Sequence, residues 1–70
     1  MSNSIDVTVN GRQQPLDAGL TAETLVDQLA LSGQRIAIEI NGEIVPRSTF
    51  AEHRIVDGDC IEIVRAVGGG

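Results

Sequence analysis

Apolar and polar residues alternate in short runs along most of the chain, with the two-residue period of strands that bury one face. The first run covers residues 5–9, and Asn10-Gly11 follows it with residues that accept the positive φ angles of a tight hairpin turn. Residues 36–40 repeat the alternation, Asn41-Gly42 repeats the turn, and Pro46 ends the short strand that follows. The pattern predicts two β-hairpins.

The return strand of the first hairpin is predicted over residues 12–16. Pro15 has no N–H to donate to a neighbouring strand, so this strand is expected at an edge of the sheet, with Leu16 turned inward. A last strand is predicted over residues 60–65, after a turn at residues 57–59.

In this last strand the two-residue period places Ile61 and Ile63 on one face, and Glu62, Val64 and Ala66 on the other. Its second face therefore combines small apolar groups with a carboxylate.

A helix is predicted between the two hairpins. Thr21 is well placed to cap its N-terminus, and Glu23 puts a negative charge in the first turn, where the helix dipole favours it. The helix is expected to run to about Leu31, with Ser32-Gly33 as its stop. Its expected inner face consists of Ala22, Leu25, Val26 and Leu29.

The segment between the second hairpin and the last strand is less regular, and Phe50 and Ile55 are expected to cover an open end of the core. The order of elements predicts an α+β domain, with one helix packed across a mixed sheet of four to five strands. Seventy residues allow one domain, which we assign to residues 1–67, followed by a flexible glycine tail at residues 68–70.

The charge of the chain argues against binding to nucleic acid or to anionic lipid. Ten acidic and five basic residues give a net charge of -5, and every basic residue is Arg. An acidic surface repels phosphates, although it can dock on a basic patch of a partner protein. The N-terminus carries no signal-peptide pattern and the chain no spanning segment, so we predict a cytoplasmic protein without a membrane partner.

Isolated reactive side chains do not form a recognisable catalytic or metal-binding set. Cys60 is the single cysteine and is interpreted as a small packed side chain, and His53 is expected to lie at the surface or to cover the core. We therefore expect no metal site, no bound cofactor and no catalytic residue within the domain.

The element order and the terminal glycines resemble the ubiquitin-like β-grasp fold, and more narrowly the ThiS-like sulfur carriers of thiamine biosynthesis. The narrower resemblance rests on residues 41–47 (Asn-Gly-Glu-Ile-Val-Pro-Arg), on Asp57-Gly58-Asp59, and on residues 61–64 leading to the glycines. It implies a protein cosubstrate rather than an enzyme.

In that family the carboxylate of the last glycine, here Gly70, is adenylated and converted to a thiocarboxylate that donates sulfur for thiazole formation. A terminal carboxyl has a pKa of roughly 3.3 to 3.7, so at neutral pH it is ionised and can attack the α-phosphate of ATP. Gly68 and Gly69 would form a tail thin enough to enter a partner's active site.

The resemblance implies three partners: a ubiquitin-activating-like adenylyltransferase, which uses the ATP, a thiazole synthase, and a persulfide donor of the cysteine desulfurase or rhodanese type. The candidate docking surface is the outer face of the last strand. Arg47 either caps nearby carbonyl groups or contacts a partner. The candidate partner-binding residues are Arg47, Val64, Arg65, Ala66 and Val67.

Other functions remain open at this point. The same fold and tail occur in the small subunit of molybdopterin synthase and in carriers for cysteine synthesis or tRNA thiolation. A ubiquitin-like protein modifier shares the adenylation step. A β-grasp module that only binds a partner would make the glycines incidental.

Overall fold

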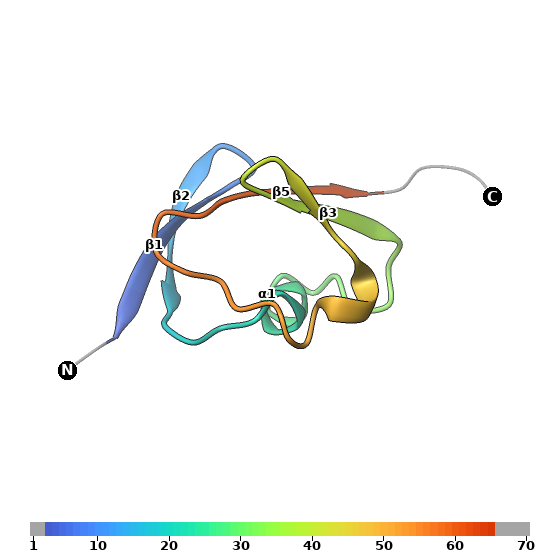
Figure 1. Ribbon diagram of the computed structural model, residues 1–70, viewed down its shortest axis with the longest axis horizontal. Coiled ribbons are helices and arrows are strands. Elements are labelled where there is room, and N and C mark those ends of the chain that lie inside the picture. Colours follow the sequence, from blue (N-terminus) through green and yellow to red (C-terminus); the bar gives the residue numbers. More distant parts are fainter. Residues whose placement is uncertain (1–2, 66–70) are drawn as a thin grey trace.

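The computed structural model describes residues 3–65 of the 70-residue chain. One α-helix lies across one face of a five-stranded sheet (Figure 1). The elements are β1 (Ser4–Val9), β2 (Arg12–Asp17), α1 (Ala22–Gln28), β3 (Ile36–Ile40), β4 (Glu43–Val45), the 3-10 helix η1 (Arg47–Thr49) and β5 (Cys60–Arg65). The predicted α+β architecture is confirmed, with five strands.

The strand order is β2-β1-β5-β3-β4, so the last strand of the chain lies at the centre of the sheet. β5 runs parallel to β1 and antiparallel to β3, which makes the sheet mixed. β2 and β4 are the edges, and Pro15 lies in β2 opposite Asp6. An edge strand tolerates a residue that cannot donate to a further neighbour, so the predicted edge position is confirmed.

Both hairpin turns have the predicted conformation. Asn10 and Gly11 have φ angles of 51° and 84°, and Asn41 and Gly42 have φ angles of 54° and 86°. Two successive positive φ angles define the type I′ turn, whose twist matches that of the strands it joins.

The helix begins as predicted and ends earlier. The hydroxyl of Thr21 accepts a hydrogen bond from the backbone N–H of Thr24 at 3.3 Å, which caps the N-terminus. At the other end Leu29 is already the C-cap and Ala30 has a φ angle of 60°, so the prediction of a helix to Leu31 was wrong.

The early end is a Schellman motif. The N–H of Leu31 donates to the carbonyl of Val26 at 2.9 Å, and the N–H of Ala30 donates to the carbonyl of Asp27 at 3.0 Å. Leu31 then packs against the hydrophobic core, which supplies the apolar contact typical of this motif. Tertiary packing of Leu31 therefore accompanies the left-handed turn at Ala30, two residues before the expected stop.

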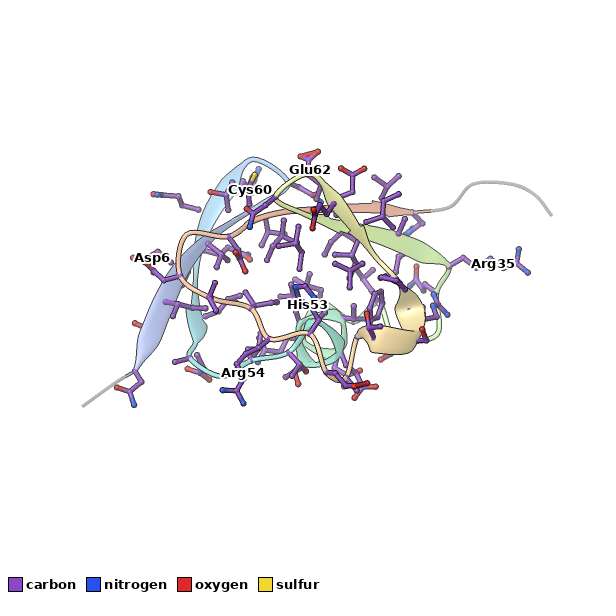
Figure 2. All side chains as sticks on the ribbon, viewed as in Figure 1. Asp6, Arg35, His53, Arg54, Cys60 and Glu62 are labelled. Carbon is purple, nitrogen blue, oxygen red and sulfur yellow. The ribbon has the colours of Figure 1, made fainter. Side chains whose placement is uncertain are left out.

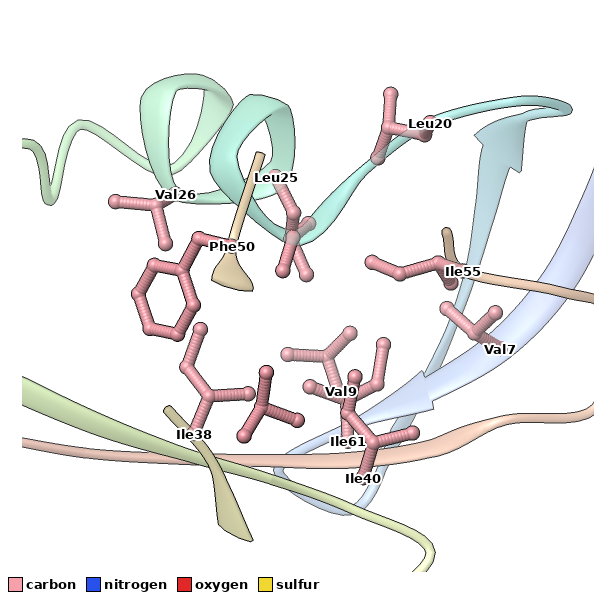
Figure 3. Close-up of a cluster of buried hydrophobic side chains, with 12 residues drawn as sticks. Val7, Val9, Leu20, Leu25, Val26, Ile38, Ile40, Phe50, Ile55 and Ile61 are labelled. Atoms are coloured by element: carbon pink, nitrogen blue, oxygen red, sulfur yellow. The ribbon is translucent and has the colours of Figure 1, made fainter. Parts of the chain in front are cut away.

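The core lies between α1 and the inner face of the sheet (Figure 3). Phe50 and Ile55 are 8% and 1% exposed and close the side of the core that the sheet and helix leave open, as predicted. The buried hydrophobic residues are Val7, Val9, Leu20, Ala22, Leu25, Val26, Ile38, Ile40, Val45, Phe50, Ile55 and Ile61. None of the helices within residues 3–65 is long and apolar enough to cross a membrane.

Candidate functional site at the end of β5

The central strand β5 ends at Arg65, immediately before the residues for which sequence analysis predicts the chemistry. Ala66, Val67 and the predicted tail at residues 68–70 lie outside the described part of the chain. The described part of the candidate site is therefore β5 itself, the bonds that fix it, and the surface around its end.

On one side β5 is attached to β1 and to the first hairpin turn. The N–H of Asn10 donates to the carbonyl of Ile61 at 2.8 Å. The side-chain Oδ1 of Asn10 accepts from the N–H of Ile63 at 2.7 Å. A turn residue thus continues the hydrogen bonding between the strands beyond the end of β1.

On the other side the second hairpin turn makes an equivalent attachment. The N–H of Asn41 donates to the carbonyl of Cys60 at 2.8 Å, and its Oδ1 accepts from the N–H of Cys60 at 2.9 Å. The Asn-Gly pattern predicted only the turn at Asn41. Its bond to β5 depends on the sheet order, which brings both turns beside the strand.

Asp59 completes this attachment. Its side chain is 6% exposed, and its two carboxylate oxygens accept from the side-chain amide of Asn41 at 3.0 Å and from the N–H of Val56 at 2.9 Å. A buried carboxylate needs such partners, because an unpaired one costs several kcal/mol. Asp59 therefore has a structural role at the start of β5.

The outer face of the sheet, away from α1, carries exposed apolar side chains near the end of β5. Val64 is 57% exposed and lies opposite the exposed Ala37 of β3, and Ile44 of β4 is 70% exposed. We call Ala37, Ile44 and Val64 the outer apolar patch. A contiguous exposed apolar surface is a candidate for a protein contact.

Two carboxylates lie within this face. Glu39 of β3 is paired with Ile44 on one side and with Glu62 of β5 on the other. Like charges directly opposite each other on a sheet destabilise the free protein. A partner that brings a positive charge to Glu39 and Glu62 would relieve this repulsion.

Cys60 lies on the same outer side as Glu62, whereas His53 lies on the side of the sheet that faces α1 (Figure 2). The Cys60 thiol is free and exposed, so its interpretation as a packed side chain was wrong. The strand period gives the reason: Ile61 points into the core, and the preceding residue must point out. His53 is half-buried, which fits the predicted position at the surface or over the core.

The two candidate arginines have different environments. Arg65 is exposed at the end of β5, opposite Ile36 of β3. The guanidinium of Arg47 donates to the carbonyl of Gln34 at 2.7 Å and ties η1 to the connection before β3. Of the two alternatives for Arg47, the carbonyl-binding one is therefore confirmed, while a partner contact remains a prediction.

Within residues 3–65 no group of three or more His, Cys, Asp or Glu side chains is placed to hold a metal ion.

Comparisons with known proteins place this geometry in a family. The model of the ThiS family matches residues 7–70. The crystal structure of the thiamine biosynthesis protein ThiS from Geobacter metallireducens superposes with a TM-score of 0.82 at 30% identity, over 94% of this chain and 100% of that chain.

Two proteins of known name match most of this chain in sequence. The sulfur carrier protein ThiS of Escherichia coli is 33% identical over 94% of this chain and 100% of its own length. A thiazole synthase from Paramagnetospirillum magneticum is 39% identical over 91% of this chain, but the matched segment is only 20% of that protein. The family match and the E. coli relative bear out the prediction of a carrier rather than an enzyme. Fold, family model and relatives agree, and the chain belongs to the ThiS family.

Proposed function

We propose that this chain is the sulfur carrier of thiamine biosynthesis, and that it carries sulfur as a thiocarboxylate on Gly70. The observation that carries the proposal is the ThiS family match, which extends through residue 70 and so includes the glycines. The Geobacter structure supports it, because a protein of thiamine biosynthesis shares both fold and sequence with this chain.

The thiazole synthase relatives support the choice of pathway. In two such proteins, a segment of about one fifth of the length resembles this chain. A carrier-like segment within a thiazole synthase brings sulfur donor and acceptor into one molecule. We infer that this chain delivers its sulfur to a thiazole synthase, in preference to the molybdopterin, cysteine and tRNA pathways that sequence analysis left open.

The chemistry needs an activated carboxylate. The ionised Gly70 carboxylate attacks the α-phosphate of ATP, pyrophosphate leaves, and an acyl-adenylate forms. A persulfide sulfur then attacks the acyl carbon, and AMP leaves. Cleavage of the resulting acyl disulfide by a thiol of the donor system leaves a thiocarboxylate on the carrier and a disulfide on the donor system.

Every catalytic group in this scheme belongs to a partner. ATP is bound by the adenylyltransferase, sulfur comes from a cysteine desulfurase or a rhodanese-type donor, and the carrier binds no cofactor of its own. We expect the reaction in the cytoplasm, where the single thiol Cys60 stays reduced.

The carrier contributes a docking surface and a positioned tail. Ordering each flexible residue costs on the order of 1 to 2 kcal/mol, so contacts of the folded domain must offset the ordering of the glycines. We assign this role to the outer apolar patch together with Arg65, Ala66 and Val67. β5 connects the patch to the tail, and the bonds of Asn10 and Asn41 fix its register.

Intact-mass measurement tests the proposal. The purified chain is incubated with the adenylyltransferase, ATP and a persulfide donor, and we expect one oxygen to be replaced by sulfur. A variant that lacks Gly70 is the control and should gain no sulfur. The mass of the protein isolated from its own cells will show whether it ends at Gly70. An unchanged mass with an adenylyltransferase that is active on another carrier would refute the proposal.

A further inference from the structure

A pocket of about 160 Å³ lies between α1, η1 and the connection that leads into β3. Its apolar wall is formed by Val26, Leu31, Ile36 and Phe50. A cavity of roughly 150 Å³ holds a group the size of benzene, so this pocket has room for one long side chain.

The polar rim of the pocket includes two carboxylates and one guanidinium. Glu23 and Asp27 both line it, and both are exposed. They are four residues apart on α1 and therefore lie on the same face of the helix. Arg47 also lines the pocket, but its guanidinium already binds the carbonyl of Gln34.

Hydrogen bonds hold the walls of the pocket together in the free domain. The N–H of Glu23 donates to the carbonyl of Phe50 at 3.1 Å, which fixes α1 to the segment after η1. The hydroxyl of Ser32 donates to the carboxylate of Asp27. A preformed pocket loses little conformational freedom when it is filled.

The negative charge of Asp27 is unfavourable at its position on α1. It lies in the last turn of α1, which contains no basic residue. The carbonyl end of a helix disfavours a negative charge. The bond from Ser32 is a partial compensation, and a cation at the pocket would be a stronger one.

The pocket adjoins the end of the strand that leads to the tail. Ile36, which lines the pocket, is paired with Arg65, the last residue of β5. Figure 1 shows η1, the start of β3 and the end of β5 at the same end of the molecule. An enzyme that holds residues 68–70 must approach this end of the domain.

We propose that this pocket receives an arginine or lysine side chain of a partner enzyme that holds the tail, with the aliphatic stem against the apolar wall and the cationic head at Glu23 and Asp27. Both side chains combine an apolar stem with a charged end, which matches the two chemistries of the pocket. The inference rests on the proposed carrier function, since that function supplies the partner.

The test is a binding measurement with the double variant Glu23→Gln and Asp27→Asn, which keeps the size of both side chains and an acceptor for Ser32. The dissociation constants for the adenylyltransferase and for the thiazole synthase are measured by calorimetry at two salt concentrations. We expect at least one of them to rise about tenfold, with a weaker salt dependence than wild type. The free variant should melt close to wild type, because loss of the favourable charge of Glu23 in the first turn is offset by loss of the unfavourable charge of Asp27 in the last turn.

The double variant Asp6→Asn and Asp17→Asn is the matched control. It removes the same charge from the first hairpin, at the opposite side of the sheet from β3 and β4. It should bind both enzymes within about twofold of wild type, because distant charges are screened. Equal losses in both double variants would indicate a general charge effect and overturn the pocket inference.

Sulfur loading separates this inference from the proposed function. If wild type gains sulfur and the Glu23/Asp27 double variant binds both enzymes as wild type does, the pocket inference fails and the carrier function stands. If wild type gains no sulfur with an active adenylyltransferase, the carrier function fails. At saturating enzyme concentration the variant should still be loaded, because Gly70 is unchanged.

Discussion

The side-chain amide of Asn41 donates a hydrogen bond to the buried carboxylate of Asp59, 3.0 Å away. The two residues belong to different turns, one between β3 and β4 and one before β5. Through this bond the carboxylate of Asp59, the residue before the central strand β5, obtains a partner from the neighbouring hairpin. Asn41 thus combines a positive φ angle with two side-chain bonds.

Replacing Asn41 by Gly should lower the free energy of unfolding by about 2 kcal/mol, since the bonds to Asp59 and Cys60 are lost while Gly accepts the same φ angle. Asn41→Asp should cost more, because it places a second carboxylate beside Asp59. Urea unfolding measures the free energy of unfolding of both variants. A Gly variant as stable as wild type would mean that the two side-chain bonds contribute nothing.

Replacing Ala30 by Gly should stabilise the protein by about 0.5–1 kcal/mol. Ala30 has a φ angle of 60°, and an L-residue in this region is strained by about 1–2 kcal/mol. Gly removes this strain, but its greater freedom in the unfolded chain cancels part of the gain. Thermal unfolding gives the difference. Ala51→Gly is the control: Ala51 is exposed in a turn without a positive φ angle, and this change should not stabilise the protein.

Replacing Glu62 by Gln should stabilise the free protein by about 0.2–1 kcal/mol at low salt, because the charge opposite Glu39 is removed. The gain should shrink as salt screens the repulsion. Glu43→Gln serves as comparison, since Glu43 is paired with Ile40 and not with a carboxylate. Equal effects of the two changes at all salt concentrations would show that Glu39 and Glu62 do not interact.

Replacing Val64 by Asp should slow sulfur loading about tenfold at enzyme concentrations below saturation, with little change in stability, because it disrupts the outer apolar patch. Val56→Asp is a close control: Val56 and Val64 are 55% and 57% exposed, and Val56 lies in the loop before β5. Loading is followed by intact mass. Equal rates for the two variants would exclude the patch from docking.

The alternating pattern and the two Asn-Gly pairs were sufficient to predict every strand within one residue, because strand period and turn conformation are local properties. The end of the helix was missed for the opposite reason. Ala30 carries no sequence signal for a left-handed conformation, and its turn accompanies the packing of Leu31 against the core.

The candidate site was predicted only in part. The exposure of Val64 on the outer face followed from the strand period, whereas the burial of Cys60 was inferred from its residue type against that same period. The bonds from Asn10 and Asn41 to β5, and the pocket beside Arg47, depend on which segments meet in the folded chain. Sequence spacing alone does not specify those meetings.

The central position of β5 has a mechanical consequence. Its parallel neighbour β1 and its antiparallel neighbour β3 are hydrogen-bonded to it on opposite sides. A pull on Arg65 along the strand would load in shear the bonds to β3 along its length and the bonds to β1 near Cys60 and Ile61, and would not open the strand from an edge. The domain is thus expected to resist traction applied at this end of the strand.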